Sequence, residues 1–353
     1  MAPNPIILLV VLFLLPLSSS SLPPPHPIPA IIVFGDSTVD SGNNNYLVTL
    51  LKANFPPYGR DFPGGRPTGR FCNGRLVTDF ISEALGLPPT VPPYLDPAYS
   101  IQDFAAGVSF ASAGTGLDIA TSQPFAVIPL MQEAELFKEY TVQLARDLGE
   151  EKARYIISEA AYIVSVGTND FIENYFSMTT DRRKQFSLEE FGDYIIGVAA
   201  KFLTEIYSLG ARKIAFSGLT PFGCLPVVRA ANLLNNRECV EEFNEAAREF
   251  NVKLEEMIDR LDASLPGIKL RYTAVYDFLL YAIQHPRLYG FENAVEACCG
   301  TGEFEVGFLC NKWNPYTCED ADRHLFWDAV HPSEKLNAWL ANLTLNTSLA
   351  EFL

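Results

Sequence analysis

Histidine is the side chain that most readily exchanges a proton near neutral pH, and this chain has four: His26, His285, His324 and His331. Asp328 precedes His331 by three residues, and on a helical turn this spacing would place both side chains on one face. A carboxylate there can accept the Nδ1 proton of the imidazole, which leaves Nε2 free to take a proton from a hydroxyl. Asp320 and His324 form a second pair at helical spacing, so spacing alone leaves both pairs open.

A serine in a sharp turn could supply that hydroxyl. Ser37 follows Gly35 and Asp36 at the end of the apolar run at residues 30–34. Glycine permits a tight turn, and a position at the end of a strand would expose the hydroxyl at the rim of a sheet. The simpler interpretation of Gly-Asp-Ser is a β-turn, or a helix capped by Asp36 or Ser37.

A serine nucleophile also needs hydrogen-bond donors for the negative charge that develops on its substrate. Asn169 follows a second apolar run, at residues 161–166, and its side-chain amide could reach the same edge of a sheet. Gly114 offers a backbone N–H with no side chain in the way. Read without a catalytic role, these are a turn asparagine and a packing glycine.

The hydrophobic pattern predicts the elements that must position these residues. Apolar runs indicate buried strands at residues 30–34 and 161–166, and two further strands are predicted at residues 213–216 and 268–275. Apolar residues at steps of three and four indicate helices at residues 77–85, 136–148, 194–209 and 240–261. Residues 54–75, rich in Pro, Gly and Arg, are expected to form a loop.

Alternation of strands and helices predicts an α/β fold with a mainly parallel sheet and helices on both faces. Ligands of such folds bind beyond the carboxyl ends of the strands, where Ser37 and Asn169 are expected. The sequence contains no repeat and no internal linker, so residues 22–353 are predicted to form one catalytic domain.

The first residues indicate the compartment. Residues 6–17 form an apolar run that is shorter than the ~20 residues of a membrane-spanning helix. Small residues follow, so residues 1–21 are predicted to be a signal peptide of a secreted protein. Two glycosylation sequons, at Asn342 and Asn346, agree with secretion.

Seven cysteines lie beyond the predicted signal peptide, and in an oxidising compartment most of them should form disulfides. The count is odd, so one thiol is left over or pairs between chains. The last four are spaced CC-x10-C-x7-C, which lacks the short Cys-x2–4-Cys spacing of zinc sites. No metal and no cofactor are expected, because the chain has no H-E-x-x-H, Walker or complete G-x-G-x-x-G motif. The net charge of −16 disfavours a nucleic-acid partner.

Four short segments are weak indications of function when taken singly, but their order and spacing along the chain are specific. They are FGDSTVDSGNN at residues 34–44, FASAG at 110–114, VGTND at 166–170 and WDAVHP at 327–332. Their order and spacing closely resemble the GDSL esterase/lipase family, the plant branch of the SGNH hydrolases. The PFGCLP segment at 221–226 and the CCGTG segment at 298–302 are also typical of that branch.

The resemblance implies a role for each matching residue. It implies that Ser37 is the nucleophile, His331 the general base and Asp328 its orienting partner, which favours His331 over His324. The N–H groups of Ser37 and Gly114 and the Asn169 amide would form the oxyanion hole. The family's name-giving leucine is Thr38 here, and Ser109 stands where asparagine is common, which places Gly114 less firmly than the other residues.

The same resemblance implies a three-layer α/β/α sandwich with a flavodoxin-like sheet. The implied activity is hydrolysis of a carboxylic ester, of a lipid or another acyl compound, through an acyl-enzyme on Ser37. The alternative is an acyltransferase with the same residues, in which an alcohol replaces water. A binding protein without catalysis is a third hypothesis, which labelling with a fluorophosphonate would separate from the first two. No segment beyond the signal peptide has the length of a membrane span.

Overall fold

The computed structural model describes residues 28–177 and 180–353, and the predicted signal peptide lies outside them. Five parallel strands form one sheet in the order β2-β1-β3-β4-β5. They are β1 (Ile31–Gly35), β2 (Gly107–Ser109), β3 (Ala161–Ser165), β4 (Lys213–Ser217) and β5 (Lys269–Thr273). This is the flavodoxin-like order, so the predicted parallel sheet is confirmed.

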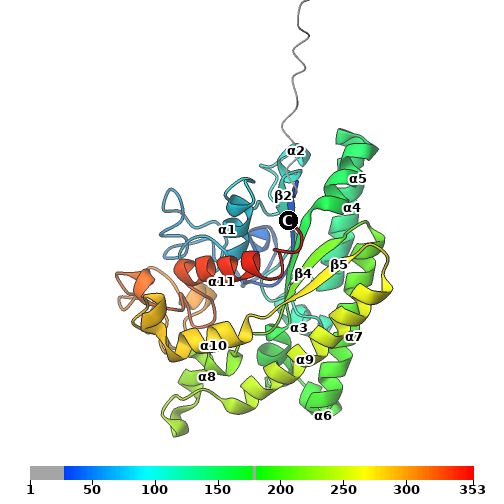
Figure 1. The fold of residues 1–353 in the computed structure, drawn as a ribbon. Coiled ribbons are helices and arrows are strands. Elements are labelled where there is room, and N and C mark those ends of the chain that lie inside the picture. Colours follow the sequence, from blue (N-terminus) through cyan, green and yellow to red (C-terminus); the bar gives the residue numbers. More distant parts are fainter. Residues whose placement is uncertain (1–27, 178–179) are drawn as a thin grey trace, which may run out of the picture.

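Helices cover both faces of the sheet (Figure 1). One face packs against α4 (Leu130–Leu148), α5 (Glu150–Glu159), α7 (Leu188–Ser208) and α9 (Glu241–Ser264). The other face packs against α1 (Val77–Ala84) and α11 (Glu334–Asn346), with α10 (Tyr276–Gln284) beside them. The remaining short helices are α2 (Ile101–Phe104), α3 (Ile119–Ser122), α6 (Arg182–Gln185) and α8 (Pro226–Ala231).

Successive strand residues alternate between the two layers. In β1, Ile32 and Phe34 pack under α4 and α7, whereas Ile31 and Val33 belong to the cluster under α1 and α11. Burial on both faces explains why β1 and β3 appear in the sequence as continuous apolar runs. The three-layer α/β/α architecture is therefore the one that the sequence predicted.

Helix α7 begins six residues before the predicted start at residue 194. Ser187 caps it: the Ser187 side chain accepts from the N–H of Glu190, and the Glu190 carboxylate accepts from the N–H of Ser187. This reciprocal pair extends the helix beyond its strongest apolar periodicity. Helix α4 likewise starts earlier than predicted, directly after Pro129.

Three disulfides join Cys224 to Cys239, Cys298 to Cys318 and Cys299 to Cys310. Cys72 is buried and unpaired, which confirms that one thiol is left over. Across residues 28–177 and 180–353, no helix has the length and apolar character needed to cross a membrane.

Candidate active site

Ser37 lies in a sharp turn at the carboxyl end of β1. The turn starts at Gly35, whose φ of +134° favours glycine, and a Cβ there would lie 1.9 Å from the carbonyl oxygen of Ser165 on β3. The N–H of Gly35 donates to the buried carboxyl of Glu133 on α4, at 2.9 Å. No side chain other than hydrogen fits at residue 35, so β1 can turn close against β3 and present Ser37 at the sheet edge.

The turn is closed by Asp36. Its N–H donates to the Ser165 carbonyl at 3.0 Å, and its carboxylate accepts from the N–H and the hydroxyl of Thr38, at 3.0 and 2.7 Å. Burial raises the pKa of Asp36, while the Thr38 hydrogen bonds act in the opposite direction. Thr38, which stands in the place of the family leucine, is therefore part of the turn that holds Ser37.

The His331 imidazole bridges Ser37 and Asp328. Its Nε2 lies 2.7 Å from the Ser37 hydroxyl, and its Nδ1 lies 2.7 and 2.8 Å from the two carboxylate oxygens of Asp328. All three side chains are buried, with Ser37 the most exposed at 7%. This order is the arrangement in which an imidazole takes a proton from a serine hydroxyl while a carboxylate holds its tautomer.

Asp328 and His331 do not lie on a helical turn, the conformation in which their spacing would place both side chains on one face. The two residues lie in a loop closed by a bridge between Phe326 and Pro332, just before α11. The Asp328 carboxylate accepts from the N–H groups of Val330 and His331, at 3.0 and 2.8 Å, and this turn brings the side chains together. The i,i+3 spacing therefore pairs the two side chains through this hydrogen-bonded turn and not through helix geometry.

The rival histidine lies apart from Ser37. Nδ1 of His324 lies 3.3 Å from the backbone carbonyl of Asp320, so the contact within this pair is to the backbone and not to the carboxylate. Its Nδ1 or Nε2 lies within 4.8 Å of the sulfurs of Cys298 and Cys318, a potential metal group. Because those two sulfurs form a disulfide, they are not free to ligate a metal.

Asn169 follows β3 and lines the cavity beside Ser37. One N–H of its amide donates to the carbonyl of Thr115 at 2.9 Å. An asparagine amide carries two N–H groups, so the second remains available to a ligand. The hydrogen bond to Thr115 therefore orients the Asn169 side chain and leaves one amide N–H for a ligand.

Gly114 precedes Thr115 and has a φ of +89°, a conformation that favours glycine. A Cβ at this position would lie 2.5 Å from Cδ1 of Leu51, the end of a flexible side chain that can move, so the backbone conformation rather than space is what favours glycine. Among the described residues, Gly114 is not one of those that line the cavity, whereas Asn169 is. The segment that contains Gly114 is thus linked to Asn169 by the hydrogen bond from the Asn169 amide to the Thr115 carbonyl.

Polar residues after Ser37 fasten the Gly114 segment to β1, a function that the sequence analysis missed. The buried Asp40 carboxylate accepts from the N–H groups of Gly42, Asn43 and Ala113, at 2.7, 2.7 and 3.0 Å. Burial raises the pKa of Asp40 to about 6. The Asn43 amide donates to the carbonyls of Ser109 and Ala111, at 2.8 Å each. The signal was visible in the run DSGNN, because Asp and Asn side chains readily form hydrogen bonds to nearby backbone groups.

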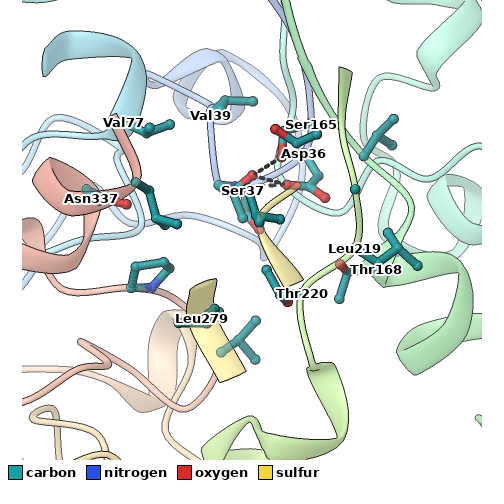
Figure 2. Close-up of a pocket in the computed structure, with 18 of the residues that line it drawn as sticks. Asp36, Ser37, Val39, Val77, Ser165, Thr168, Leu219, Thr220, Leu279 and Asn337 are labelled. Atoms are coloured by element: carbon teal, nitrogen blue, oxygen red, sulfur yellow. Dashed lines mark hydrogen bonds between the residues drawn. The ribbon is translucent and has the colours of Figure 1, made fainter. Parts of the chain in front are cut away.

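A cavity of about 90 Å³ opens beside Ser37. Figure 2 shows Ser37 near its centre, with Val77 and Asn337 on one side and Thr168 and Leu219 on the other. The side under α1 and α11 is mainly apolar; it is lined by Val39, Val77, Ile81, Ile163, Leu340 and Thr344. The site therefore combines a hydroxyl–imidazole–carboxylate chain with a slot for an apolar group.

Comparisons with known proteins agree with this geometry. A family model described as GDSL-like lipase/acylhydrolase matches residues 31–344. Three Arabidopsis thaliana proteins, each named GDSL esterase/lipase, are similar to the chain along most of its length. They are 56% identical over 92% of both chains, 55% identical over 88% of both, and 48% identical over 98% of both.

Proposed function

Because the chain belongs to the GDSL-like lipase/acylhydrolase family and is thus a hydrolase of carboxylic esters, we propose that it acts through an acyl-enzyme on Ser37. The observation that carries this proposal is the pair of contacts made by His331, to the Ser37 hydroxyl at 2.7 Å and to Asp328 at 2.7 Å. A serine hydroxyl is a weak nucleophile unless a base adjoins it, and this arrangement supplies the base.

In the proposed reaction, the Ser37 oxygen attacks the ester carbonyl as Nε2 of His331 takes the hydroxyl proton. Asp328 stabilises the resulting imidazolium. The free N–H of Asn169 and the backbone N–H groups of Ser37 and Gly114 would donate to the tetrahedral oxyanion. When the C–O bond breaks, His331 returns the proton to the departing alcohol. A water molecule then attacks the acyl-enzyme by the same route and regenerates Ser37.

A fluorophosphonate tests this proposal directly. It phosphonylates only an activated serine, and digestion followed by mass spectrometry should place the label on Ser37. An unlabelled protein would instead be a binding module. Labelling without hydrolysis of any p-nitrophenyl ester, together with ester formation when an alcohol is added, would favour the acyltransferase.

We further propose that the acyl part of the substrate is an aliphatic chain that enters the slot under α1 and α11. Its walls are mainly the apolar side chains of β3, α1 and α11, and it is continuous with Ser37. Burying a methylene group contributes about 0.8 kcal/mol, so such a slot favours longer acyl chains over acetate.

Replacing Leu340 by tryptophan tests this slot. Leu340 lines the cavity from α11, and a larger ring should obstruct the acyl chain while leaving Ser37 accessible. We expect kcat/KM for p-nitrophenyl octanoate to fall about tenfold relative to acetate, as discrimination in apolar pockets generally allows. Leu343→Trp on the same helix is the control, because Leu343 does not line the cavity. An equal loss for both esters would contradict the slot.

Secretion remains part of the proposal. The three disulfides are typical of an oxidising compartment. Both sequon asparagines, Asn342 and Asn346, are exposed on α11, so a glycan on either would extend into solvent. The Asn346 amide donates to the carbonyl of Asn342 at 2.7 Å.

A further inference from the structure

Tyr58 contacts Asp328 on the side of the carboxylate away from the Val330 and His331 N–H groups, and it lies within residues 54–75, which the sequence predicts to be a loop. Its side chain is 1% exposed, and its hydroxyl donates to Oδ2 of Asp328 at 2.6 Å. The same hydroxyl accepts from the N–H of Gly307 at 2.8 Å. Burial, and then the charge of Asp328, raise the pKa of Tyr58 well above its ordinary value. The phenol is therefore neutral, and its one proton is directed at Asp328.

We infer that Tyr58 is a positioning residue for ester hydrolysis: its hydroxyl fixes the Asp328 carboxylate and reduces the negative charge that Asp328 presents to His331. This inference rests on the proposed roles of Ser37, His331 and Asp328. It extends the chain of hydrogen bonds by one side chain, from Gly307 through Tyr58 and Asp328 to His331.

Both oxygens of Asp328 lie near Nδ1 of His331, at 2.7 and 2.8 Å, but their other partners differ. Oδ1 accepts from the N–H groups of Val330 and His331, so the turn itself holds it. Oδ2 lies 2.8 Å from Nδ1 of His331, and Tyr58 supplies its other hydrogen bond. In the described chain, Tyr58 is therefore the donor that occupies this oxygen from outside the turn. Without it, a buried carboxylate oxygen would lose its second partner.

Aromatic packing holds the Tyr58 ring in this position. Phe55, Phe71 and Trp327 contact it edge-on, with centroids 5.9, 5.7 and 6.1 Å away. Phe71 also lies against the His331 ring, at 4.9 Å. Packing against three rings thus fixes the orientation of the Tyr58 ring, and with it the position of the hydroxyl next to Asp328.

Other ionisable groups surround the same pair. The charges of Asp36 and His331 interact across the turn after β1, and the buried Cys72 thiol interacts with the charges of Glu334 on α11 and Asp328. Burial raises the pKa of Cys72, so its thiol is neutral. These groups are unchanged when Tyr58 is altered, so a change in the pH profile of a Tyr58 variant would be due to Tyr58.

Tyr58→Phe tests the inference, because it removes one hydroxyl and keeps the ring. We expect kcat to fall about tenfold with KM little changed. The acidic limb of the kcat/KM profile should move to higher pH. The reason is that Asp328, relieved of the Tyr58 proton, stabilises the protonated, inactive imidazole more strongly. Active sites are counted by fluorophosphonate labelling, so that misfolded protein does not contribute.

Tyr162→Phe is the matched control. Tyr162 is also fully buried, and its hydroxyl donates to the Ile157 carbonyl at 2.7 Å, away from Ser37. This variant loses a buried hydrogen bond too, but its pH profile should match wild type. A Tyr58→Phe enzyme with the wild-type profile, or with a kcat loss that Tyr162→Phe reproduces, would overturn the inference.

A second measurement keeps the ring, the hydroxyl and the fold. Site-specific 3,5-difluorotyrosine at residue 58 makes the phenol a stronger donor, so the acidic limb should move to lower pH. A shift in the same direction as that of Tyr58→Phe, or no shift, would contradict the inference. If wild type hydrolyses esters while both Tyr58 changes are silent, only the role of Tyr58 fails. If wild type neither labels nor hydrolyses, the proposed function fails with it.

Discussion

Replacing Ser37 by alanine is expected to lower kcat by a factor on the order of 10³ or more, with little change in the thermal midpoint Tm. The hydroxyl contacts Nε2 of His331, and in the proposed mechanism it forms the bond to the acyl group. Its contribution to folding is small, because the turn is held by Asp36, Thr38 and Gly35 rather than by the Ser37 side chain.

The measurement is hydrolysis of p-nitrophenyl esters from acetate to palmitate, with wild type and variant compared at equal folded concentration. Ser41→Ala is the control, since Ser41 is also buried and its hydroxyl has no hydrogen-bond partner in the described structure. Ser41→Ala should retain kcat within about twofold, because it removes no group that reacts or binds. Turnover retained by Ser37→Ala would remove Ser37 from the mechanism.

Replacing Asn169 by alanine is expected to lower kcat by roughly 10²–10³, the cost of removing one oxyanion donor in other hydrolases. The Asn169 amide is already oriented by Thr115, at 2.9 Å, so its second N–H needs no reorganisation when charge develops on the substrate. KM should change little, because the donor acts on the tetrahedral oxyanion more than on the ground-state carbonyl.

Two further variants sharpen this test. Asn169→Asp keeps the size of the side chain but removes both N–H groups, so it should be at least as impaired as the alanine variant. Asn45→Ala removes a similar bond, from an asparagine amide to the Thr68 carbonyl at 2.8 Å, outside the cavity. Its kcat should stay within about twofold of wild type. A loss below tenfold for Asn169→Ala would exclude Asn169 from the oxyanion hole.

Much of the scaffold was predictable, because strands buried on both faces leave a strong signal. Four of the five strands were predicted, three of them from apolar runs and β5, KLRYT, without one, and the alternation of strands with helices predicts the parallel sheet. The exception is β2, which has three residues and lies at the sheet edge, so it is too short to produce a distinct pattern. The early start of α7 was missed because Ser187 and Glu190 determine it through capping, not through periodicity.

The candidate site was less predictable from first principles. Asp320–His324 and Asp328–His331 have similar spacings, and only the family segments favoured His331. The structure shows why spacing could not distinguish the two pairs. The turn at Asp328 is held by hydrogen bonds from the N–H groups of Val330 and His331 to the Asp328 carboxylate, and not by a helix. Tyr58 was missed because its partner lies 270 residues away, a contact that no local pattern encodes.

The separation of 294 positions between Ser37 and His331 also has a consequence for biosynthesis. With the roles proposed here, a nascent chain holds its nucleophile long before the ribosome adds its base. Any product that stops before His331 carries a serine that no imidazole activates. With these roles, the chain is therefore latent until the ribosome has added His331.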